Sequence, residues 1–177
     1  VAVSGGSDSL ALLYLSHDWA QARGRNLIAF TFDHRLRDAS AGEAVRVGET
    51  CRSLGIRHET LQWDAPVSRQ SAARRARHAA LACALKAHGG MVLLTGHTTD
   101  DQAETFLMRA RQGSTWYGLA GMQAVSPSPV WPEGAGVRIA RPLLTARRSD
   151  LRNMLEARGA DWVEDPTTDN PAYERVR

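Results

Sequence analysis

Apolar runs alternate along this chain with segments in which apolar residues recur at helical spacing. Residues 27–32 and 91–95 are nearly unbroken apolar runs, which is typical of parallel strands that are covered on both faces. Two further strands are predicted over residues 56–61 and 137–144. The apolar residues 1–3 predict a short first strand, and the apolar run 10–15, which follows after a turn, predicts a buried helix.

Turn and capping signals set the ends of the remaining helices. A helix is predicted from Ser40 to just before Gly55, and the next from Ser68 or Ser71 to the glycines at 89 and 90. Thr99 and Gln102 predict a capping box at the start of a fourth helix, and residues 149–158 predict a short one that ends at Gly159. Residues 126–136, rich in proline and glycine, read as a loop or the tip of a loose hairpin.

The alternation of strands and helices predicts an α/β fold with an open, doubly wound parallel sheet and right-handed crossovers. Ligands of such sheets bind beyond the carboxyl ends of the strands, near the switch in strand order. We therefore expect the helix N-termini that follow strands to lie together on the ligand side. Residues 1–122 are predicted to form the ligand-binding α/β core, residues 123–165 to complete the same domain, and residues 166–177 to form a mobile tail.

Length and composition agree with a single globular domain. The chain has 177 residues, of which 43% are apolar, and no apolar run approaches the roughly 20 residues that a membrane helix needs. We therefore expect no membrane among its partners. The 22 basic residues outnumber 19 acidic ones and are mostly arginine, which suits contacts with phosphates and bases; a nucleic-acid partner and a GC-rich genome explain this equally well.

The two cysteines indicate a cellular location, and the first residues indicate where the natural chain begins. Cys51 and Cys83 fall at apparent core positions of two helices, so buried thiols are expected rather than a disulfide or a metal site, and a cytoplasmic location follows. The chain has neither a signal peptide nor an initiator methionine, and its first strand is very short. We therefore expect its natural N-terminus to lie upstream.

The hexapeptide Ser4-Gly5-Gly6-Ser7-Asp8-Ser9 lies between the apolar start of the chain and the first helix. Adjacent glycines let the backbone turn sharply and bring its N–H groups close to a ligand, and serine hydroxyls add donors where the helix dipole favours phosphate. Asp8 would repel a bare phosphate, so it is either a helix cap or a contact to a metal that neutralises the phosphates. The simpler interpretation is an ordinary Gly-Gly turn with a serine cap.

Two of the predicted helices carry the other candidate residues. Arg74 and His78 share a face with the apolar positions 81 and 85, so Arg74 is the candidate for an inward role; a solvated basic helix is the alternative. Asp101 and Glu104 are neighbours on the next helix. A carboxylate pair opposite a phosphate site calls for a cation, either magnesium or a substrate amine. His97 is either a phosphate ligand or a loop histidine with a local partner.

Several motifs occur in one order and cover nearly the whole chain. They are SGGSDS (4–9), DHRLR (33–37), GHTTDDQAET (96–105), GLAGM (118–122), RPLL (141–144) and WVEDP (162–166). Together they resemble the tRNA(Ile)-lysidine synthase family of PP-loop ATP pyrophosphatases, and the resemblance implies an adenine nucleotide alpha hydrolase-like fold of the PP-loop type. The mononucleotide loop and the dinucleotide fingerprint are absent, because the lysine of the first and the third glycine of the second are missing.

The resemblance implies a ligase that forms a carbon–nitrogen bond. In that family ATP adenylates the C2 oxygen of the wobble cytidine of tRNA(Ile), pyrophosphate leaves, and the ε-amine of free L-lysine displaces AMP. ATP and Mg²⁺ are thus implied as cosubstrate and cofactor, and a tRNA(Ile) with a cytidine at the wobble position as the partner. A homodimer is among the assemblies expected.

The same resemblance assigns roles to single residues. Residues Ser4, Gly5, Gly6, Ser7, Asp8 and Ser9 would bind ATP, with Asp8 near the phosphates and magnesium. Asp101 and Glu104 would hold the lysine, and either would accept the proton that its amine loses. Arg74 and Arg175 match active-site arginines of the family, so the implied catalytic residues are Asp8, Arg74, Asp101, Glu104 and Arg175.

The chain also departs from the family pattern. Ser114-Thr115-Trp116-Tyr117 replaces a small, glycine-containing loop, and His78 stands where the family usually has tyrosine. The chain ends soon after Arg175, without the C-terminal tRNA-binding domains of most members, so we expect ATP binding with a weaker hold on tRNA.

Three alternative functions remain at this point. A PP-loop cytidine thiolase would use Cys-x-x-Cys pairs, to which neither Cys51 nor Cys83 belongs. A GMP-synthetase-like ligase is disfavoured by the segments DHRLR (33–37) and DDQAE (100–104). The third alternative is a non-catalytic ATP-binding domain.

Overall fold

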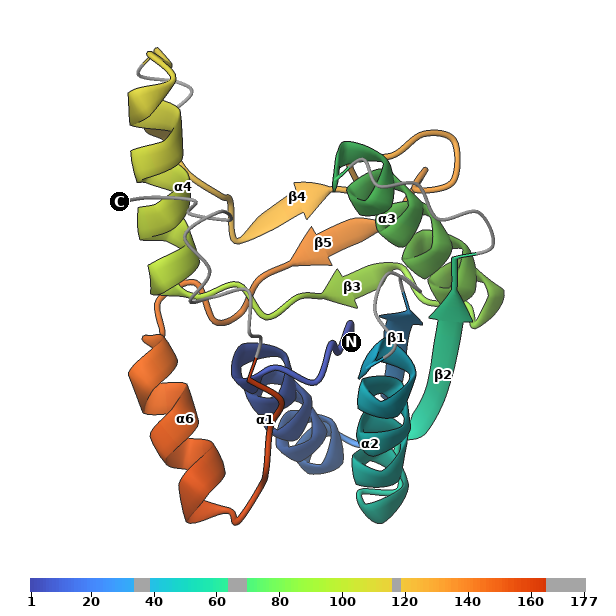
Figure 1. The fold of residues 1–177 in the computed structure, drawn as a ribbon. Helices are drawn as coiled ribbons and strands as arrows, with labels where there is room; N and C mark the ends of the chain where they lie inside the picture. Colours follow the sequence, from blue (N-terminus) through green and yellow to red (C-terminus); the bar gives the residue numbers. More distant parts are fainter. Residues whose placement is uncertain (34–38, 64–69, 116–118, 165–177) are drawn as a thin grey trace.

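The computed structural model describes residues 1–33, 39–63, 70–115 and 119–164, and Figure 1 shows their arrangement. β1 (Ile28–Asp33) and β2 (Arg57–Gln62) pair in parallel. β3 (Val92–Leu94) pairs in parallel with β5 (Arg138–Ala140), which pairs antiparallel with β4 (Val125–Pro127). The short N-terminal segment joins the two groups, because the Ala2 N–H donates to Leu94 at 2.9 Å and the Val3 N–H donates to Phe30 at 2.8 Å.

The joined strands therefore run in the order β2, β1, residues 1–3, β3, β5 and β4. The order reverses direction between residues 1–3 and β3, so the switch point at which doubly wound sheets bind their ligands falls there. β3 and β5 both point toward α4 in Figure 1. The pairings β1–β2 and β3–β5 are parallel, as the sequence predicted, whereas β4 pairs antiparallel with β5.

Five of the helices occupy the positions that the sequence pattern indicated. They are α1 (Ser7–Arg23), α2 (Ala39–Ser53), α3 (Gln70–Ala87), α4 (Thr99–Arg111) and α6 (Arg148–Ala157). α1, α2 and α6 contribute to one apolar cluster, in which Leu12, Leu13 and Leu155 are almost fully buried. α3 closes a second cluster around Phe30 and Leu93. In both clusters, apolar residues of the helices pack against apolar residues of the strands.

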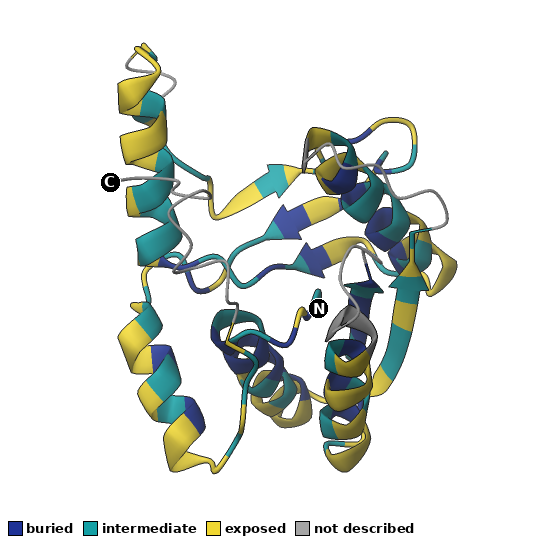
Figure 2. Cartoon of the chain, in the orientation of Figure 1, coloured by how far each residue is buried: buried dark blue, intermediate teal, exposed yellow. Residues whose placement is uncertain are grey.

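α4 is the exception to this packing, because none of its residues is buried. Figure 2 shows it as a helix of intermediate and exposed residues that stands at the end of the sheet. Among the described residues, no helix is long and apolar enough to cross a membrane.

Three expectations about local structure are corrected. β5 ends at Ala140 rather than at residue 144, and β4 is a strand where the sequence indicated loop or hairpin tip. Cys51 is buried as expected, whereas Cys83 is exposed; both thiols are free. The core position assigned to Cys83 was therefore wrong. The predicted tail at 166–177 lies outside the described residues, so its mobility stays a prediction.

Candidate active site

The hexapeptide forms a turn whose backbone leads directly into α1. Gly5 has a φ of +91°, which favours glycine, and Gly6 is the N-cap of α1 without any side-chain cap. Both the aspartate cap and the serine cap expected here are therefore wrong. The Ser9 hydroxyl instead donates to the Gly6 carbonyl at 3.0 Å and accepts from the Ser4 N–H at 3.1 Å. Because the N-cap is a glycine and makes no side-chain cap, it leaves the first N–H groups of α1 available to an anion.

Two distant segments hold this turn in place. The Val163 N–H donates to the Gly5 carbonyl at 3.0 Å. On the other side, Gly96 approaches so closely that an added β-carbon would lie 2.9 Å from the Asp8 carbonyl oxygen and 3.0 Å from the Ser9 Cα. Gly96 thereby brings the loop between β3 and α4 against the turn, and the start of α4 follows within three residues.

The start of α4 uses one carboxylate for its own cap. Thr98, which is fully buried, is the N-cap, and Asp101 at position N3 completes a capping box. The expected box from Thr99 to Gln102 is wrong by one residue. Asp101 Oδ2 accepts from the Thr98 N–H at 2.7 Å and from its hydroxyl at 2.9 Å. Only Oδ1 of Asp101 is thus left to face a ligand.

Three carboxylates from two helices converge on the guanidinium of Arg148. Its Nε donates to Asp8 Oδ2 at 2.9 Å, while its other nitrogens lie 3.5 Å from Asp101 Oδ1 and 3.9 Å from Glu104 Oε1. The sequence predicted that the glycine turn and the pair Asp101–Glu104 would share one cleft and that a cation would be needed there. The geometry brings these residues together, and in this structure the cation is a side chain of the protein.

Asp100 fixes the position of that arginine. Its Oδ2 accepts from the backbone N–H of Arg148 at 2.9 Å, so the first turn of α4 caps the start of α6. Burial lowers the pKa of Arg148, but the bond to Asp8 and the charges of Asp8, Asp101 and Glu104 outweigh burial and raise it overall. Arg148 therefore stays charged and carries the positive charge of the cleft.

Basic residues gather at the same edge of the sheet. His78 is buried in α3, and burial followed by the charges of Arg77 and Arg74 lowers its pKa to about 4. Burial also lowers the pKa of His97, with Asp101 opposing and Arg141 adding to the effect. The His97 Nδ1 lies 3.0 Å from the Thr95 hydroxyl, which agrees with the local-partner interpretation. Arg74 is exposed, so the inward position expected of it was wrong; its charge still lowers the pKa of both histidines.

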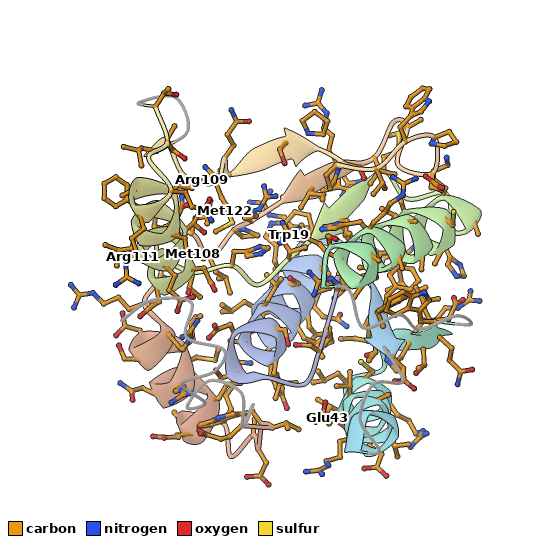
Figure 3. All side chains as sticks on the ribbon, turned by 45° about the horizontal axis from the view of Figure 1, so that its top comes forward. Trp19, Glu43, Met108, Arg109, Arg111 and Met122 are labelled. Carbon is orange, nitrogen blue, oxygen red and sulfur yellow. The ribbon has the colours of Figure 1, made fainter. Side chains whose placement is uncertain are left out.

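Gln102 ties a further segment to α4. Its side-chain amide donates to the Met122 carbonyl at 2.8 Å and accepts from the Met122 N–H at 2.7 Å. Arg109 donates to the Gly121 carbonyl at 3.3 Å, and Figure 3 shows Arg109 and Met122 close together on this side of the helix. The end of the GLAGM motif (118–122) is therefore held beside the helix that carries Asp101 and Glu104.

Arg148 is the site residue that the sequence analysis missed. Its guanidinium reaches the cleft from the second unit of the predicted domain, far along the chain from Asp8 and Asp101. One signal was present, because Arg147 and Arg148 are two cations at the N-terminus of a helix, where the dipole disfavours positive charge. Arg175 and most of DHRLR (33–37) lie outside the described residues, so the role expected of Arg175 stays a prediction.

Comparisons with known proteins agree with this geometry. The sequence matches the PP-loop domain family over residues 1–177. It is 63% identical over 177 residues to a tRNA(Ile)-lysidine synthase of Hyphomonas neptunium, a match that covers 100% of this chain and 48% of that protein. It is 46% identical over 184 residues to the tRNA(Ile)-lysidine synthase of Brucella anthropi, covering 99% of this chain and 40% of that protein.

Among solved structures, the U34-tRNA thiolase NcsA from Methanococcus maripaludis is similar in fold. The TM-score is 0.75 at 18% identity, and the match covers 93% of this chain and 57% of that chain. The chain thus spans about half the length of the curated relatives it matches. The α/β fold of PP-loop type that the sequence predicted is confirmed.

Proposed function

Because this chain belongs to the PP-loop domain family and is similar along its whole length to tRNA(Ile)-lysidine synthases, we propose that it contributes the catalytic site of such an enzyme. The reaction is the ATP-dependent ligation of L-lysine to C2 of the wobble cytidine of tRNA(Ile), through an adenylated cytidine, with release of pyrophosphate and AMP. The convergence of Asp8, Asp101 and Glu104 at the uncapped start of α1 carries this proposal. It sets an anion site and a cation site side by side, as a reaction of ATP with an amine requires.

The residues of the glycine turn are proposed to bind the phosphates of ATP. The open N-terminus of α1 and the N–H groups of Gly5 and Gly6 would hold the phosphates of ATP. Arg74, at the basic edge beside His78 and His97, would stabilise charge that builds on the α-phosphate. Arg175 is proposed for a second contact of this kind.

Magnesium fits this site through a single carboxylate. Asp8 is the acidic residue next to the turn, and nucleotide sites often hold Mg²⁺ through one or two carboxylates plus the substrate phosphates. No group of three or more acidic, histidine or cysteine side chains that could hold a metal by itself is present among the described residues. Bound with ATP, the ion would neutralise phosphate charge.

Asp101 and Glu104 are proposed to bind the ammonium group of the substrate lysine. Because Oδ2 of Asp101 already accepts the capping hydrogen bonds of α4, Asp101 would orient the lysine ammonium through Oδ1. Within the described part of the chain Glu104 makes no capping hydrogen bond, and 42% of its side chain is exposed. We therefore assign to Glu104 the acceptance of the proton that the amine loses before attack.

The test uses the full-length protein with ATP, labelled lysine and a tRNA(Ile) transcript that carries cytidine at the wobble position. We expect lysine to become attached to the tRNA. Pyrophosphate should be released with ATP and tRNA, in the adenylation step, and AMP only when lysine is present as well. A transcript with another base at the wobble position is the control and should take up no lysine. Release of pyrophosphate in the presence of all three substrates, without attachment of lysine to the tRNA, would overturn the proposal. A thiolase would ignore lysine, and a non-catalytic domain would release nothing.

The proposed roles of the two carboxylates separate in kinetics. Asp101→Asn and Glu104→Gln should each raise the KM for lysine by about tenfold or more, the usual effect of losing a hydrogen bond to a charged group. Glu104→Gln should in addition lower kcat, more steeply below neutral pH than above it. Unchanged lysine turnover in Asp101→Asn would remove Asp101 from the site. A tRNA and free lysine as substrates would place the reaction in the cytoplasm, and the expected homodimer stays a prediction.

A further inference from the structure

The three contacts of Arg148 are unequal. Only the one to Asp8, at 2.9 Å, has the length of a charge-assisted hydrogen bond, whereas Asp101 at 3.5 Å and Glu104 at 3.9 Å are held mainly by charge. Asp8 is also the most enclosed of the carboxylates, with 17% of its side chain exposed against 26% for Asp101 and 42% for Glu104. Arg148 is therefore bound firmly on one side and loosely on the other.

The backbone of Arg148 does not take part in this asymmetry. Its N–H is fixed by Asp100, so the start of α6 stays in place while the long side chain can turn. Without a cation, Asp8, Asp101 and Glu104 would repel one another, because all three lie within 4 Å of one guanidinium. A second cation that enters this cleft meets the two carboxylates that Arg148 holds least tightly.

We propose that Arg148 is a positioning residue that stays on Asp8 and releases Asp101 and Glu104 to the ammonium group of the incoming lysine. This inference rests on the proposed function and adds a residue to it. On the side of the glycine turn, Arg148 offsets the charge of Asp8, which would otherwise repel the phosphates of ATP. On the side of α4, it occupies the lysine site and competes with lysine for it. The same side chain therefore favours one substrate and opposes the other.

Because Arg148 is expected to favour ATP and oppose lysine, its removal should shift the two KM values in opposite directions, which a purely structural role would not do. Arg148→Gln in the full-length protein should raise the KM for ATP and lower the KM for lysine, each by about threefold to tenfold, the effect of one charge in a partly exposed site. Arg148→Lys keeps the charge and should restore the KM for ATP toward that of the unmodified protein. Arg147→Gln removes the same charge one residue away, from an exposed position, and should change neither constant.

The outcomes separate this inference from the proposed function. If both KM values rise together in Arg148→Gln, or neither changes, Arg148 only supports the structure and the inference is wrong. If the unmodified protein attaches no lysine to tRNA, the proposed function fails. Equilibrium titration with ATP then still decides whether Arg148 offsets Asp8, because weaker ATP binding in Arg148→Gln is expected from that contact alone. Equal ATP affinity in the two proteins would overturn it.

Discussion

Gly96 lies so close to Asp8 that a β-carbon on Gly96 would be 2.9 Å from the Asp8 carbonyl oxygen. The contact joins the turn before α1 to the loop before α4. It therefore sets the distance between the proposed phosphate site and the proposed lysine site. The neighbour on the other side of the contact is backbone, which cannot swing away as a flexible side chain would.

Gly96→Ala should consequently displace one of these two segments. We expect a loss of about 1–3 kcal/mol in the free energy of unfolding, the usual cost of overpacking, and a rise in the KM values for both ATP and lysine. Gly42→Ala is the matched control, because a β-carbon there meets nothing within 4 Å and the residue lies in α2. It should leave both constants unchanged. Denaturant unfolding and steady-state kinetics check the pair; normal kinetics in Gly96→Ala would show that the contact is unimportant.

Asp100 supports the site through the helix that carries Arg148. Asp100→Ala leaves the first N–H of α6 without its carboxylate, and the free energy of unfolding should fall by about 1 kcal/mol. The KM for lysine should change as well, because the backbone N–H of Arg148 loses the hydrogen bond that fixes its position. Asp150→Ala removes an acidic residue from the first turn of the same helix and should affect stability less and lysine binding not at all. Equal effects of both substitutions on lysine binding would contradict the role of Asp100.

Apolar patterning and turn chemistry explain how much of this fold was predictable. β1 is a mostly buried apolar run and α1 begins at a glycine turn, so local sequence alone defines them. β3 was also recognised as an apolar run, but the expectation that both its faces are covered was wrong, because Val92 is exposed and only Leu93 is buried. β4 was missed because Val125, Ser126 and Pro127 show neither an apolar run nor a clear alternation. It is an edge strand that exists through pairing with β5, and Pro127 is tolerated at such an edge.

The candidate site was predictable only where short motifs define it. The turn at residues 4–9 and the pair Asp101–Glu104 are each local, and the topology of a doubly wound sheet brings them to one edge. The capping box was misplaced by one residue because Thr98 and Thr99 are both good N-caps and only the tertiary structure selects between them. Arg148 was missed because its role depends on a side chain that reaches from α6 to the starts of α1 and α4, for which no local spacing exists.

The two cysteines differ in a way that chemical labelling can measure. Burial raises the pKa of the Cys51 thiol to about 11, so very little thiolate is present at neutral pH, whereas Cys83 is exposed on α3. In the folded protein a maleimide should label Cys83 and spare Cys51, and in denaturant it should label both. Peptide mass spectrometry assigns the sites. Labelling of Cys51 at the rate of Cys83 would contradict the burial of Cys51 in the apolar cluster that α1, α2 and α6 share.

His78 should make the stability of the domain depend on pH. It is buried in α3, and its pKa is lowered to about 4 by burial and then by the charges of Arg77 and Arg74. Neither of its ring nitrogens has a hydrogen-bond partner in the part of the chain that the structure describes. The folded state therefore disfavours the protonated ring and gains nothing from the polar atoms of the neutral one.

The direction of the effect follows from proton linkage. In the unfolded chain the ring takes up a proton as the pH falls below about 6.5, whereas in the folded protein it stays neutral down to about 4. The contribution of His78 to stability is thus complete above pH 6.5 and decreases between pH 6.5 and 4, by about 3 kcal/mol at most for a shift of this size. The lowered pKa values of His97 and His58 act in the same direction.

His78→Leu removes this titration. Because the ring nitrogens make no hydrogen bond among the described residues, the variant should be at least as stable as the unmodified protein at pH 7. Its free energy of unfolding, measured by urea denaturation at several pH values, should fall less steeply between pH 6.5 and 4. Some slope should remain, because His97 and His58 still titrate. An identical slope in the two proteins would mean that His78 takes up its proton in the folded state at ordinary pH, and the burial of its ring beside Arg74 and Arg77 would have to be abandoned.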